Sequence, residues 1–67
     1  MKDRLGNELK IGEIVKIVGK YDIPLYNYWI VDSFFEYPTA IDVVLVHFHT
    51  NEVRFIPILD IERPFGD

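Results

Sequence analysis

Turn-forming residues interrupt this chain at short intervals along its whole length, and this spacing constrains the fold more than any other feature. No window of about eleven residues shows the apolar period of an amphipathic helix. The pieces between the turns are rich in β-branched and aromatic residues, which favour strands. The chain is therefore predicted to be all-β, with short strands joined by turns. The turn-forming positions are Gly6, Asn7, Gly12, Gly19, Pro24, Pro38, Thr50, Asn51, Pro57 and Pro64.

Five strands are expected from this pattern. The most apolar one spans 41–49, and apolar residues on both of its faces indicate a central position in the sheet. A tight turn at Thr50 and Asn51 is expected to join it to a strand at 52–56, where apolar and polar residues alternate. The other strands are expected at 14–18, 28–36 and 61–63, with one turn of 3₁₀-helix at 57–60.

Alternation within 28–36 predicts which of its side chains fill the core, because successive residues of a strand point to opposite faces. The more suitable core face carries Trp29, Val31, Ser33 and Phe35, and the opposite face carries Ile30, Asp32, Phe34 and Glu36.

The length of the chain, 67 residues, suits one domain, so 1–67 is assigned to a single domain whose first residues, 1–8, form a loosely ordered arm. A chain of this size buries only about 60% of the surface that its unfolded form exposes. It has no cysteine, so it can form neither a disulfide nor a thiolate zinc site. Aromatic residues make up 15% of the chain, and their large side chains can build a core without such crosslinks.

The charge balance is acidic, with seven lysines and arginines against eleven aspartates and glutamates and a net charge of −4. General binding to nucleic acid needs an excess of basic residues, so this balance disfavours it while leaving a focused basic patch open. The chain has no apolar run of the roughly 20 residues that cross a bilayer, and no apolar segment of a secretory signal. A cytoplasmic protein that does not bind a membrane is expected.

Two stretches of the sequence share a pattern with a known kind of barrel. Residues 9–17 carry a hydrophobic residue, then Gly12, Glu13, Val15 and Ile17 at the spacing hydrophobic-x-x-Gly-acid-x-Val-x-Ile. Residues 53–62 carry a strand, a proline, a short 3₁₀ turn and a final strand. Both stretches resemble SH3-like barrels of the KOW-like kind. This resemblance implies a small five-stranded SH3-like barrel with a long loop after the first strand and a 3₁₀ turn before the last.

The first nineteen residues also resemble small phage and prophage proteins of the YopX type. The shared residues are Asp3, the run 6–9 and the run 12–15, which together cover less than a third of the chain. This resemblance implies a phage- or prophage-encoded protein.

Aromatic residues gather in the long loop and the second strand, where SH3-like barrels place their ligand groove. A partner-binding role is predicted for Tyr21, Tyr26, Tyr28, Trp29 and Tyr37. The alternative is that these rings fill and cap the core, above all Trp29 and Phe35. Exposed rings of this kind would also suit self-association into a homo-oligomer.

His47 and His49 stand two positions apart on an expected strand, so their side chains would share a face. This arrangement could hold a metal ion or respond to pH, because histidine titrates near neutrality. The alternative is that both are ordinary surface residues, and no third ligand can be named. No metal or other cofactor is therefore expected.

The sequence favours a binding protein over an enzyme, because it offers no nucleophile paired with a base and no phosphate-binding glycine loop. The leading hypothesis is a non-catalytic protein–protein interaction module that binds a host or viral protein through its aromatic loop and strand. The alternatives are a KOW-like nucleic-acid-binding module and a small structural subunit of a larger assembly.

Overall fold

A computed structural model describes residues 1–64 of the chain, and it confirms an all-β fold. Five strands and one 3₁₀ turn lie close to their expected positions. Their bounds are β1 Ile14–Ile17, β2 Trp29–Glu36, β3 Ile41–His47, β4 Val53–Pro57, η1 Ile58–Asp60 and β5 Ile61–Glu62. Within residues 1–64 no helix is long and apolar enough to cross a membrane.

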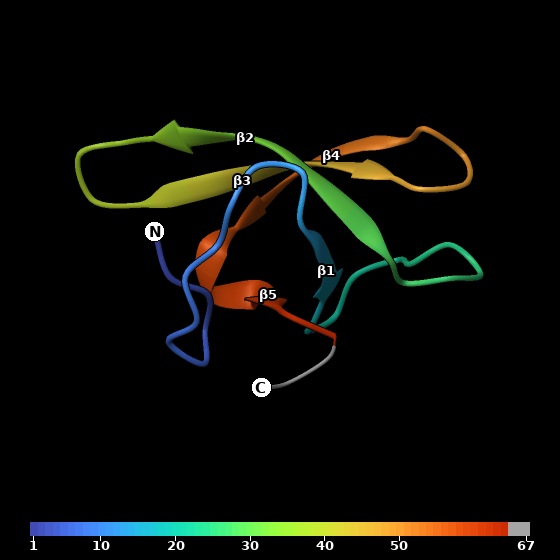
Figure 1. Ribbon diagram of the computed structural model, residues 1–67, viewed down its shortest axis with the longest axis horizontal. Helices are drawn as coiled ribbons and strands as arrows, with labels where there is room; N and C mark the ends of the chain where they lie inside the picture. Colours follow the sequence, from blue (N-terminus) through green and yellow to red (C-terminus); the bar gives the residue numbers. More distant parts are fainter. Residues whose placement is uncertain (65–67) are drawn as a thin grey trace.

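The strands form one antiparallel sheet in the order β4-β3-β2-β1-β5. The sheet coils strongly, so that β1 and β5 lie below the layer of β2, β3 and β4 in Figure 1. The sheet is not closed into the predicted barrel in the described residues, because β4 and β5 are the two edges and do not pair with each other. The three-residue η1 turns the chain away from β4. The two residues of β5 then pair with β1 and not with β4.

The core fills the inside of this coiled sheet. Trp29 is its largest member, and its indole ring is fully buried. Burial of so large an apolar side chain is a main source of stability in a small domain without crosslinks. The buried apolar residues are Leu9, Val15, Ile17, Trp29, Val31, Val43, Leu45, Ile56, Ile58 and Ile61.

The core face predicted for β2 is wrong beyond Val31, because the strand contains a bulge. Val31 pairs with Leu45 and Ser33 pairs with Val44, so Asp32 has no partner of its own on β3. An extra residue in one strand reverses the alternation of the side chains that follow it. Phe34 consequently packs against the core, whereas Phe35, expected inside, is 50% exposed on the outer face.

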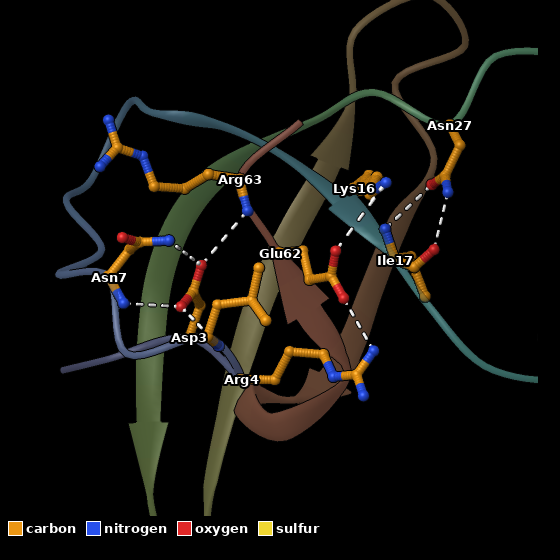
Figure 2. A network of polar contacts seen from close by, with 9 residues as sticks. Asp3, Arg4, Asn7, Lys16, Ile17, Asn27, Glu62 and Arg63 are labelled. Atoms are coloured by element: carbon orange, nitrogen blue, oxygen red, sulfur yellow. Dashed lines mark hydrogen bonds and ion pairs between the residues drawn. The ribbon is translucent and has the colours of Figure 1, made fainter. Parts of the chain in front are cut away.

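The N-terminal segment, expected to be a loosely ordered arm, is attached to the end of β5 through Asp3 (Figure 2). The buried carboxylate of Asp3 accepts hydrogen bonds from the backbone N–H groups of Leu5 at 2.9 Å, Asn7 at 2.8 Å and Arg63 at 3.3 Å. Burial alone would raise the pKa of Asp3, but these donors and the Asn7 side-chain amide outweigh it, so the pKa is lowered. A buried charge that accepts several hydrogen bonds is a stable anchor.

Glu62 strengthens the same attachment. Its carboxylate lies 2.7 Å from the Arg4 guanidinium and 3.8 Å from the Lys16 ammonium, so one acid joins the N-terminal segment, β1 and β5 (Figure 2). The backbone N–H of Arg4 also donates to the carbonyl of Ile61 at 3.1 Å.

Candidate partner-binding surface

Trp29, predicted to bind a partner, is a core residue and presents no surface to one. Its indole Nε1–H donates to Oδ1 of Asn27 at 2.9 Å, and its ring packs edge-on against His47. The Asn27 side chain also accepts from the Ile17 backbone N–H at 3.0 Å and donates to the Ile17 carbonyl at 2.7 Å (Figure 2). These bonds fix the end of the long loop against β1.

Tyr21 is the second of the predicted binding residues with a structural role. Its ring packs against the core, and its hydroxyl donates a 2.6 Å hydrogen bond to the Asp60 carboxylate in η1. This hydrogen bond, together with desolvation and the negative charges of Asp60 and Asp42, raises the pKa of Tyr21 above its usual value. The hydroxyl is therefore committed within the protein.

Tyr26 and Tyr28 do reach the surface, at the end of the sheet where the long loop meets the β3–β4 turn. Both rings contact Phe48 edge-on, with centroid distances of 6.0 and 6.2 Å. All three residues are partly exposed. We call Tyr26, Tyr28 and Phe48 the loop-end cluster.

Tyr37 belongs to a different group of exposed rings at the opposite end of β2. Its ring lies 5.1 Å from that of Phe35, and the Phe35 ring lies 6.4 Å from that of Phe55 on β4. Phe55 is 56% exposed. These residues form the outer-face cluster, and the β2 bulge is what brings Phe35 into it.

An apolar row continues the outer-face cluster across the sheet. Cross-strand pairing places four residues in register on β1, β2, β3 and β4, one on each strand. Neighbours in such a row have their side chains on the same face and in contact distance of one another. The row consists of Ile14, Ile30, Val46 and Val53, of which all but the half-buried Val46 are exposed.

The charges around this outer face are unbalanced. Among residues 1–64, no cation lies within ion-pair distance of Asp32, Glu36 or Asp42, all of which belong to β2 and β3. By contrast, Lys16 pairs with Glu62 and Arg54 pairs with Glu52. The surface is thus apolar with unpaired negative charges beside it.

The two histidines do not share a strand face. His47 is buried at the end of β3, while His49 lies in the following turn, so the predicted pairing of their side chains is wrong. Nδ1 of His47 accepts from the backbone N–H of Thr50 at 3.1 Å, and Nε2 faces the Tyr26 carbonyl. Both ring nitrogens are thus occupied. No group of three metal-ligating side chains occurs in the described part of the chain.

The sequence reasoning missed most of the outer face. Alternation within β4 does place Val53 and Phe55 on the face away from the buried Ile56. This alternation is the one sequence signal for the outer face. The aligned partners on β1 and β2 depend on strand register, which the residues alone do not reveal.

Comparisons of the chain with protein-family models, with curated proteins and with solved structures found no match in any of the three. The resemblances to KOW-like barrels and to YopX-type proteins therefore rest on the residues that carry them.

Proposed function

We propose that this protein is a non-catalytic interaction module that binds a partner protein across the outer face of its sheet. The observation that carries the proposal is the register of Ile14, Ile30, Val46 and Val53, which makes one continuous apolar row beside the outer-face cluster. Large continuous apolar patches on soluble proteins mark interaction sites.

The balance between buried and exposed apolar residues supports this proposal. Among residues 1–64, ten apolar residues form the core, whereas thirteen large hydrophobic residues are exposed. Apolar side chains that stay exposed to water contribute little to the stability of the isolated domain. A partner that covers them would remove this apolar surface from water, and such burial is favourable by about 25 cal/mol per Å².

The residues proposed to bind the partner therefore differ from those predicted from the sequence. Tyr37 keeps its predicted role, and Phe35 and Phe55 join it in the outer-face cluster. Tyr26 and Tyr28 stand apart in the loop-end cluster, which could contact a large partner only at its margin. The YopX-type resemblance favours a host or viral protein as the partner, and the coiled sheet with its 3₁₀ turn supports an SH3-like architecture as part of the same proposal.

The charged residues give little support to the alternative that the protein is a KOW-like nucleic-acid-binding module. A local basic patch would use Lys16, Lys20 and Arg54, and two of these, Lys16 and Arg54, are engaged by Glu62 and Glu52. Binding to phosphates would have to compete with these ion pairs and with the net charge of −4.

Capture of partners by the tagged protein from a lysate of its source organism, with and without nuclease, tests the proposal. The Phe55→Thr variant removes an outer-face ring, and Leu25→Ser removes an equally apolar side chain that is 88% exposed in the long loop. We expect one protein to remain bound after nuclease to the wild type and to Leu25→Ser, and to be lost from Phe55→Thr. Loss of all binding on nuclease treatment, or equal capture by Phe55→Thr, would contradict the proposal.

A further inference from the structure

A shallow open pocket of about 490 Å³ lies next to the outer-face cluster, where the β2–β3 turn meets η1. Tyr37 belongs to both, because its ring lies against that of Phe35 on the outer face and the residue is also part of the pocket lining. A partner lying on the outer face therefore has the pocket within reach of its side chains.

The walls of this pocket are almost entirely uncharged. Ile41, Pro57 and Leu59 supply apolar surface, and Leu59 is 70% exposed although it is a large hydrophobic residue. Among the residues that the structure describes, the one charged residue in the lining is Glu36. Its carboxylate has no cation within ion-pair distance among residues 1–64.

This combination defines the chemistry of a ligand. An apolar wall favours a side chain with an aliphatic stem, and a single unpaired carboxylate favours a positive head. Tyr37 is the aromatic residue of the lining, and a planar cation can stack on such a ring. A guanidinium meets all three conditions, because it stacks on aromatic rings and pairs with carboxylates through two parallel hydrogen bonds.

We propose that the pocket accepts an arginine side chain of the partner protein, with the guanidinium at Glu36 and Tyr37 and the aliphatic stem against Ile41, Pro57 and Leu59. The inference rests on the proposed function, and it specifies the partner as a protein that presents an arginine beside an apolar surface. The unpaired carboxylates of Asp32 and Asp42 on the neighbouring part of the sheet favour the approach of such a basic partner.

The test uses two capped tripeptides and the full protein. One peptide is leucine–arginine–leucine, and the other carries citrulline in place of arginine, which keeps the shape and the stem but removes the charge. Backbone amide chemical shifts in nuclear magnetic resonance report which residues each peptide reaches. Glu36→Gln removes the pocket carboxylate, and Asp22→Asn is the matched control, because it removes an exposed carboxylate with no cation within ion-pair distance in the described residues.

We expect the arginine peptide to shift the amides of the β2–β3 turn and of η1 in a saturable way. The citrulline peptide and the Glu36→Gln variant should each bind about three- to five-fold more weakly, as is typical of a single solvent-accessible ion pair. Asp22→Asn should bind like the wild type. Equal binding of both peptides, no shifts at the pocket, or equal weakening by Glu36→Gln and Asp22→Asn would overturn the inference.

Failure of this inference is distinguishable from failure of the proposed function. If the peptides ignore the pocket while Phe55→Thr still abolishes partner capture, the arginine site is wrong and the interaction module stands. If partner capture does not depend on Phe55, the proposed function is wrong whatever the peptides do.

Discussion

Asn27 and Trp29 are joined by a 2.9 Å hydrogen bond from the indole Nε1–H to the side-chain Oδ1, and this bond satisfies the polar atom of the largest core residue. The same asparagine holds the backbone of Ile17 through two further hydrogen bonds. One loop residue therefore connects the core, β1 and the start of β2.

Replacement of Asn27 by alanine is expected to destabilise the protein by about 2 kcal/mol, because a buried indole N–H loses its acceptor. Urea unfolding followed by tryptophan fluorescence measures the change. Leu25→Ser, in the same loop but 88% exposed, should unfold like the wild type. A loss below about 0.5 kcal/mol in Asn27→Ala would show that the bond contributes little.

Asp3 makes the stability depend on acidic pH. Its pKa in the folded protein is lowered from the ordinary value of 3.8, so between the two values the unfolded chain binds more protons than the folded one. Stability from Asp3 is therefore complete above about pH 4 and is lost as the pH falls through the lower folded-state pKa.

The Asp3→Asn variant is expected to be less stable by about 1–2 kcal/mol at neutral pH, with the difference shrinking below pH 4. Urea unfolding at several pH values from 7 to 2 measures this. A difference that stays constant over the whole range would contradict the role of the ionised carboxylate.

Tyr21 gives a corresponding signal at alkaline pH. Its raised pKa means that the folded state retains the hydroxyl proton more tightly than the unfolded state does. The stabilisation is complete below about pH 10 and is lost as the pH rises through the folded-state pKa. In an ultraviolet absorbance titration, Tyr21→Phe should remove a component that titrates above pH 10. An unchanged titration at the alkaline end would contradict the bond to Asp60.

Two adjacent phenylalanines test the β2 bulge. Phe34 packs against the core and Phe35 is half exposed, so Phe34→Ala should destabilise by about 2 kcal/mol and Phe35→Ala by less than about 1 kcal/mol. Thermal unfolding followed by circular dichroism measures both. The reverse order would mean that β2 continues without a bulge and that the alternation predicted from the sequence is right.

This pair of residues also shows where the sequence is informative. The β-branched runs and turn residues were enough to predict all five strands and η1, because those signals are local. The bulge at Asp32 has no local signal, since nothing in the alternating sequence marks one residue as extra. Which residues form the outer face depends on strand register and on the bulge, so these residues could not be identified from the sequence.

The histidines illustrate the same limit. His47 and His49 look alike in the sequence, but β3 ends between them. His47→Ala should therefore destabilise by about 2–4 kcal/mol, because it removes a buried ring and leaves the backbone N–H of Thr50 without its acceptor. His49→Ala should have little effect. Thermal unfolding distinguishes the two, and equal effects would contradict the buried position of His47.

The most direct test of the central claim is the affinity of the captured partner for three forms of the protein, measured by isothermal titration calorimetry. If the outer face binds the partner, Phe55→Thr should weaken binding at least tenfold, a loss of about 1.4 kcal/mol, and Leu25→Ser should bind like the wild type. Unchanged affinity in Phe55→Thr together with weakened binding in Leu25→Ser would place the interface at the loop end of the molecule and contradict the account.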